Sequence, residues 1–116
     1  MPSIRFRINL DGEGHIGPGK VELLEYIGRL GSIAAAGRKM GMSYRRAWEL
    51  VQETSRIFGR PATMRQTGGR YGGGAQLTPL GEAIITRFRA TEAAIAEATH
   101  DDLAAFQAEV QPPTGD

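Results

Sequence analysis

The sequence predicts a mostly helical domain with one small β-hairpin. In several segments apolar residues recur every three or four positions, which is the period of an amphipathic helix. Only a glycine and a methionine separate two of these segments. A glycine-rich stretch, MRQTGGRYGGGAQLT at residues 64–78, then interrupts the helical pattern and has a short strand candidate on each side. The predicted order is one strand, three helices, two strands and a long helix.

The chain is expected to begin with a strand and a helix. In IRFRINL, residues 4–10, apolar and polar side chains alternate, as in a half-buried strand. DGEG, residues 11–14, predicts a turn. Pro18 suits the first turn of a helix, and the segment GKVELLEYIGRL after it carries an apolar stripe.

The next two helices are predicted to form a helix-turn-helix. Ser32 can cap the second helix, SIAAAGRKM, and Gly41 is expected to end it. Ser43 can cap the third helix, SYRRAWELVQETSRIF, after a turn of only two residues. The residues expected on the shared face of the third helix are Ala47, Val51 and Thr54.

The last helix is expected to start at a cap made by Thr78 and a first-turn proline, Pro79. Its apolar stripe is narrow and resembles a coiled-coil seam. The stripe loses its register near THDD, residues 99–102, so a separate short helix is expected there, followed by a disordered tail at residues 112–116. Residues 1–111 would then form a single domain. It includes the last helix, whose seam makes it the expected dimerisation helix.

Charge is distributed unevenly along the chain. The formal net charge is only +1, but residues 38–71 hold eight arginines or lysines against two glutamates, a net charge of +6. Residues 82–116 hold two arginines against seven acidic residues, a net charge of −5. The basic charge therefore coincides with the predicted helix-turn-helix and hairpin, which favours a polyanionic partner.

Several other function classes find little support. The chain has no cysteine, and His15 and His100 stand alone, so neither a metal site nor a catalytic constellation is expected. The glycine-rich stretch lacks the lysine of a phosphate-binding loop, and no cofactor is expected. No apolar run is long enough to span a bilayer and no secretory leader is recognised, so the expected location is the cytoplasm.

A tight helix-turn-helix followed by a hairpin with a basic tip is the order of a winged helix-turn-helix, β-α-α-α-β-β-α. In such domains the third helix enters the major groove of double-stranded DNA. A mobile, open hairpin tip that carries arginine can follow a groove and neutralise phosphates. The sequence therefore predicts a DNA-binding protein rather than an enzyme.

Four motifs resemble a known family. They are the GS that opens the second helix, SYxxAW in the third, the hairpin motif TGGxxGGGAxLT and LTxxGxxxI at the start of the last helix. Together they are similar to the amino-terminal DNA-binding domain of the ModE-type molybdate-responsive regulators, which is close to the LysR-type winged helix. The resemblance covers about residues 18–98.

This resemblance implies regulation of transcription by a homodimer that is held by the first and last helices and binds a pseudo-palindromic site. Full-length members of the family continue into molybdate-binding domains. Since the sequence ends at Asp116, that effector domain is expected to be absent. No residue matches the family's oxyanion site.

The candidate DNA contacts lie on the second helix, the third helix and the hairpin. Arg45 is the first choice for a base contact, because arginine pairing with guanine is the commonest specific contact. For Trp48, packing in the core is the preferred expectation over DNA contact. The candidates are Ser32, Lys39, Ser43, Tyr44, Arg45, Arg46, Trp48, Gln52, Arg65, Arg70 and Tyr71.

A second interpretation, from another function class, stays open. The chain can keep the winged-helix fold, make no productive DNA contact, and act as an interaction module that pairs with another regulator through its acidic last helix.

Overall fold

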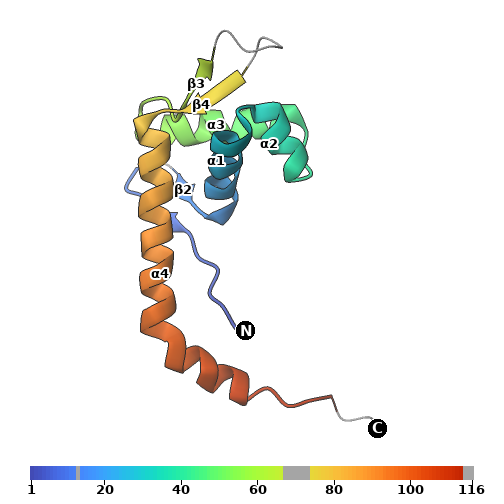
Figure 1. The fold of residues 1–116 in the computed structure, drawn as a ribbon. Helices are drawn as coiled ribbons and strands as arrows, with labels where there is room; N and C mark the ends of the chain where they lie inside the picture. The colour runs from blue at the N-terminus through green and yellow to red at the C-terminus, as the bar shows by residue number, and fades with distance from the viewer. Residues whose placement is uncertain (13, 67–73, 114–116) are drawn as a thin grey trace.

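The computed structural model describes residues 1–12, 14–66 and 74–113. A block of three helices carries a hairpin at one end, and a long fourth helix extends away from the hairpin (Figure 1). This is the predicted winged helix-turn-helix. The elements are β1 (Ile8–Asn9), β2 (His15–Ile16), α1 (Pro18–Leu30), α2 (Ile33–Lys39), α3 (Tyr44–Phe58), β3 (Thr63–Gln66), β4 (Gly74–Leu77) and α4 (Pro79–Ala108).

The amino-terminal strand differs from the prediction in length and in pairing. Only Ile8 and Asn9 form a ladder, antiparallel to Ile16 and His15 of β2, a strand that the sequence did not predict. The predicted alternation is correct from Phe6 to Leu10, because Phe6, Ile8 and Leu10 pack against the core while the residues between them are exposed. Ile4, which the same alternation places on the buried side, is 40% exposed. An extended chain places successive side chains on opposite sides whether or not it is paired along its whole length.

The helix-turn-helix is capped as predicted. The Ser32 hydroxyl accepts a hydrogen bond from the backbone N–H of Ala35 at 3.1 Å, and the Ser43 hydroxyl accepts one from the N–H of Arg46 at 3.1 Å. Gly41 has a φ of 72°, the left-handed conformation that favours glycine after a helix. The two caps and the glycine turn fix where α3 starts relative to α2.

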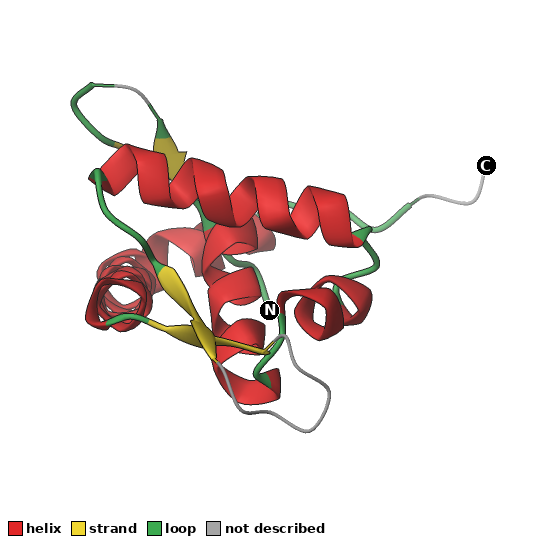
Figure 2. Cartoon of the chain, turned by 90° about the horizontal axis from the view of Figure 1, so that it is seen from above, coloured by secondary structure: helices red, strands yellow, loops and turns green. Residues whose placement is uncertain are grey.

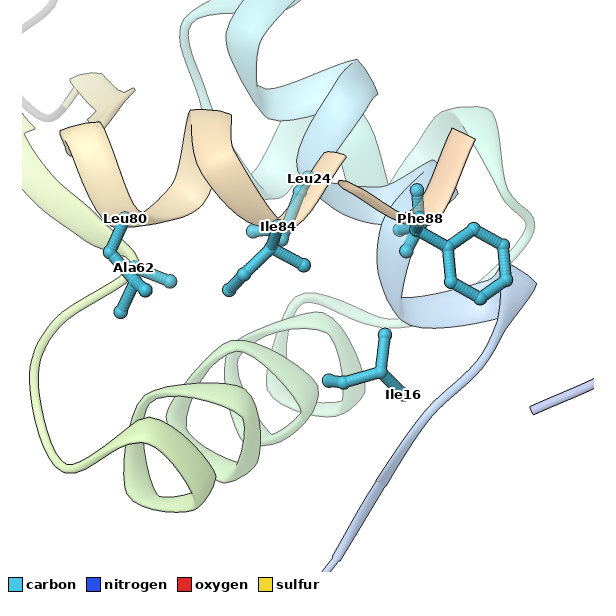
Figure 3. Packing of buried hydrophobic residues seen from close by; sticks show 7 residues of the cluster. Ile16, Leu24, Ala62, Leu80, Ile84 and Phe88 are labelled. Atoms are coloured by element: carbon cyan, nitrogen blue, oxygen red, sulfur yellow. The ribbon is translucent and has the colours of Figure 1, made fainter. Parts of the chain in front are cut away.

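Two apolar clusters form the core. One joins β2, α1 and the base of α4; Figure 3 shows its members Ile16, Leu24, Ala62, Leu80, Ile84 and Phe88. Phe88 is 1% exposed, and its ring stacks on Phe6 with centroids 4.9 Å apart. The other cluster joins α1, α2, α3 and β4 through Leu23, Ile27, Ala36, Ala47, Val51 and Ala75. The helix-turn-helix and α4 are thus both built around α1.

The expected break in the last helix is wrong, since α4 runs without interruption from Pro79 to Ala108. Residues 82–108 contain no glycine or proline, and an aspartate inside a helix costs only a fraction of a kcal/mol. Figure 1 shows that α4 bends in its last third. The Thr99 hydroxyl donates a hydrogen bond to the Ile95 carbonyl at 2.6 Å, an interaction that often bends helices.

An ion pair joins α1 to α4. Arg89 donates two hydrogen bonds to the Glu25 carboxylate, at 2.6 and 3.0 Å. These bonds hold the pKa of Glu25 below its ordinary value, against the opposing effect of burial. The pair therefore stabilises the fold only while Glu25 is ionised.

Glu25→Gln is expected to lower the free energy of unfolding by about 1 kcal/mol at neutral pH, because Arg89 is more than a third exposed and water screens the pair. Since the pKa of Glu25 is lowered in the folded state, this stabilisation is complete above the ordinary value of 4.5 and is lost as the pH falls through the folded-state pKa. Urea denaturation of both proteins across the acid range measures the difference. Glu22→Gln, at an exposed position of the same helix, is the control. A difference that stays constant with pH would contradict this role.

Candidate nucleic-acid interface

One face of α3 and the hairpin enclose a groove of about 360 Å³. Tyr44, Trp48 and Gln52 occur at every fourth position of α3, so they lie on one side of that helix. The start of α2 and both strands of the hairpin supply the rest of its lining. The lining residues are Ser32, Ile33, Ala34, Tyr44, Trp48, Gln52, Thr63, Met64, Arg65, Gly74 and Ala75.

The exposed row on α3 follows from what the helix buries. Ala47, Val51 and Thr54 are buried as predicted, and residues one position along the helix are turned by about 100°. Tyr44 is therefore 56% exposed and Trp48 is 45% exposed. The expectation that Trp48 packs in the core is wrong, because the small Ala47 takes the core position and turns Trp48 toward the hairpin.

The hairpin is attached to the helices at its base. The N–H of Ala75 donates to the carbonyl of Gly31 at 2.9 Å, in the turn between α1 and α2. The Thr78 hydroxyl donates to the carbonyl of Pro61 at 2.7 Å, and the Thr78 N–H donates to that of Ala62 at 3.0 Å. Figure 2, in which α4 is seen end-on, shows the strands beside the helices. These bonds fix β3 and β4 relative to α2 and α3.

The first turn of α3 also carries a charged cluster, whose residues do not line the groove. Arg45 is 88% exposed, and its Nε lies 3.3 Å from Oε1 of Glu49. Nη1 of Arg46 lies 3.8 Å from Oε2 of Glu49. Glu49 was not predicted from the sequence as a member of this cluster, although it lies four positions after Arg45, which is the ordinary spacing of a helical ion pair. A glutamate at this position lowers the positive charge of the turn and is also able to accept from the amino group of cytosine.

The remaining candidates are dispersed. The Ser43 hydroxyl is engaged as the cap of α3. Lys39 is exposed at the end of α2 and does not line the groove. Arg70 and Tyr71 lie outside the described residues. Met64, which the sequence did not single out, is an exposed apolar residue on β3 that lines the groove.

Other kinds of site find no support within residues 1–12, 14–66 and 74–113. That part of the chain holds no group of three or more histidine or acidic side chains able to bind a metal ion. His100 contacts Asp101 on the exposed side of α4, far along the chain from His15. None of the helices described there has the length and apolar character needed to cross a bilayer.

Curated relatives match the chain over most of its length. No protein-family model matches it. The molybdenum-pterin-binding protein MopB of Rhodobacter capsulatus is 45% identical over 82 residues, which are 71% of this chain and 30% of MopB. The transcriptional regulator ModE of Haemophilus influenzae is 34% identical over 97 residues, which are 84% of this chain and 38% of ModE. The chain thus spans about a third of the length of these relatives.

A solved structure shares the fold. The full-length LysR-type regulator LysG of Corynebacterium glutamicum, with arginine bound as effector, superimposes with a TM-score of 0.59. The match covers 82% of this chain and 30% of LysG at 21% sequence identity. At this identity the likeness shows the winged-helix fold alone.

Proposed function

Starting from a chain that resembles the ModE-type regulators in sequence and has a winged helix-turn-helix fold, we propose that it binds double-stranded DNA sequence-specifically and regulates transcription. One observation carries this proposal. Tyr44 and Trp48, both exposed, and the half-buried Gln52 form a row on α3 that faces a groove shared with Ser32 and Arg65. Aromatic, amide and guanidinium groups on one exposed helix face are the groups that read base edges and phosphates.

The roles of the side chains follow from their positions. Arg45, in the first turn of α3, is 88% exposed and is the candidate for base contact. Gln52 lies two turns further along and suits adenine. Ser32, at the start of α2, and Arg65, on β3, lie at the borders of the groove, where the sugar-phosphate backbone passes. Arg70 and Tyr71 extend this proposal to the hairpin tip.

Trp48 makes the proposal directly testable, because it is the only tryptophan in the sequence and lines the groove. Adding duplex DNA is expected to change its fluorescence in a saturable way, and added salt is expected to reverse the change, since phosphate contacts release counterions. A fluorescence titration with short duplexes at two salt concentrations measures both effects. Duplex binding that leaves the emission unchanged would contradict the placement of DNA over the groove.

The second part of the proposal is a homodimer that forms through α1 and α4. Beyond Phe88, Ile95 and Leu103 are only partly buried on one side of α4, and the amino-terminal residues Met1 and Ile4 are exposed. These residues line an apolar cavity of about 700 Å³. A second copy of α4 would cover this face by coiled-coil packing, and a dimer would present two α3 helices to a two-fold symmetric site.

Leu103→Asp is expected to convert the dimer to a monomer, since a buried unpaired carboxylate at a helix seam is strongly unfavourable. Sedimentation at tens of micromolar should give twice the chain mass for the parent and the chain mass for the variant. Glu97→Asp, at an exposed position of the same helix, is the control. A parent that sediments as a monomer would contradict the dimer.

The proposed location is the cytoplasm, and the proposed activity is not enzymatic. A second candidate function is an interaction module that pairs with another regulator. The apolar face of α4 and the exposed Phe106 favour it. A protein that captures a partner regulator but shows no affinity for any duplex would support this second function over the first.

A further inference from the structure

A second cavity, of about 510 Å³, lies between the amino-terminal segment, the start of α1 and α3. Arg46 and Leu50 line it from α3. They follow Tyr44 and Trp48 by two positions, so they are turned by about 200° from the row that faces the groove. The cavity and the groove therefore lie on different sides of α3.

Four cationic side chains from three elements line this cavity: Arg5, Arg7, Lys20 and Arg46. Lys20 is buried and already engaged, because its Nζ donates to the carbonyl of His15 at 2.9 Å and lies 3.6 Å from Glu53. The arginines are more available. Arg5 and Arg7 are exposed and, within the described ranges, form no ion pair.

The fold holds the two amino-terminal arginines in place. Phe6, between them, stacks on Phe88 in the core, so Arg5 and Arg7 both project from the opposite side of the extended chain. The stem of Arg7 also lies against the start of α1, since a Cβ on Gly17 would lie 3.5 Å from the Cβ of Arg7. The guanidinium groups are therefore carried on an anchored segment beside the cavity.

We propose that this cavity binds a phosphate-type oxyanion through Arg5, Arg7 and Arg46. Guanidinium groups bind such anions with paired, charge-assisted hydrogen bonds. The Glu49 carboxylate, 3.8 Å from Arg46, opposes the binding in part. Because Arg46 belongs to α3, the anion links the amino-terminal segment to the helix that carries the groove.

Two sources can supply the anion, a free phosphate-containing solute or a backbone phosphate of DNA that passes beside α3. Only the DNA source rests on the proposed function. For the free anion, the probe is inorganic phosphate, added to the full chain in a phosphate-free buffer at low salt. The backbone amide signals of Gly17 and Gly19, which line the cavity, report on binding by nuclear magnetic resonance.

Phosphate is expected to shift these two signals in a saturable way. Arg5→Ala/Arg7→Ala is expected to weaken the binding by about tenfold or more, because two charge-assisted hydrogen-bond donors are removed. Arg87→Ala, on the exposed side of α4, is the matched control and should bind as the parent does. Both altered arginines are exposed, and unchanged circular dichroism would show that the variant is folded.

For DNA, the dependence of affinity on salt is measured for the same three proteins. If the cavity takes a backbone phosphate, the double variant should lower the slope by about 0.9 for each phosphate that the protein no longer neutralises. A lowered slope identifies DNA as the source, and phosphate-induced shifts with an unchanged slope identify the free anion. Absence of both responses overturns the proposal, whereas a parent that binds no duplex overturns the proposed function separately.

Discussion

Phe88→Ala is expected to lower the free energy of unfolding by about 3 to 5 kcal/mol, the largest effect on stability expected of any substitution described above. Phe88 is 1% exposed, projects from α4 into the apolar cluster that also contains residues of β2 and α1, and stacks on Phe6. Truncation removes the buried ring and leaves a cavity that the surrounding helices fill only in part. Urea denaturation at one fixed protein concentration measures the decrease.

The matched control is Val110→Ala, beyond the end of α4, where the side chain is 64% exposed. It should change stability by no more than about 0.5 kcal/mol. If Phe88→Ala were as stable as this control, α4 would not be attached to the helical block through Phe88.

Arg45→Ala is expected to weaken binding to a cognate duplex by about 1 to 3 kcal/mol and to reduce the preference for that duplex over a scrambled one. Arg45 is the most exposed arginine in the ion pairs of α3 and belongs to the first turn of that helix, which the proposed function assigns to base contact. Removing a base contact affects the cognate complex more than the scrambled one, whereas removing a phosphate contact affects both equally. Fluorescence anisotropy with both duplexes at several salt concentrations measures the difference.

Glu49 requires its own control, because its carboxylate accepts from Arg45 in the free protein. Glu49→Gln keeps the size of the side chain and removes the charge that opposes DNA. This substitution should tighten binding to scrambled duplexes. If Glu49 itself reads a base, the affinity for the cognate duplex should not rise in the same way. Equal affinity of Arg45→Ala and the parent for both duplexes would remove Arg45 from the interface.

Local signals in the sequence were sufficient for most of the fold. Ser32, Ser43 and Thr78 are caps because their hydroxyls bond to backbone N–H groups three positions along the chain. The periodicity that predicts the faces of α1 and α3 is equally local. These features depend on residues that are close in sequence, so contacts between distant elements did not change them.

Features that depend on distant contacts were not predicted. The exposure of Trp48 is set by how α3 packs against other elements. The pairing of β1 with β2 is local by contrast, and it was missed because each strand is only two residues long. Gly81 shows the same limit, because a Cβ there would collide with the carbonyl of Ala62. That close approach, which joins the base of the hairpin to α4, has no signal in the sequence beyond the glycine itself.

In the proposed function, the exposed face of α3 and the hairpin read one DNA surface as part of a dimer. Selection of bound sequences from a random duplex pool tests it most directly. A dimer of this kind should enrich sequences with two related half-sites in inverted orientation, with centres about 10 base pairs or a multiple of that distance apart. A folded, dimeric protein that enriches no sequence over the starting pool, even at low salt, would contradict the claim.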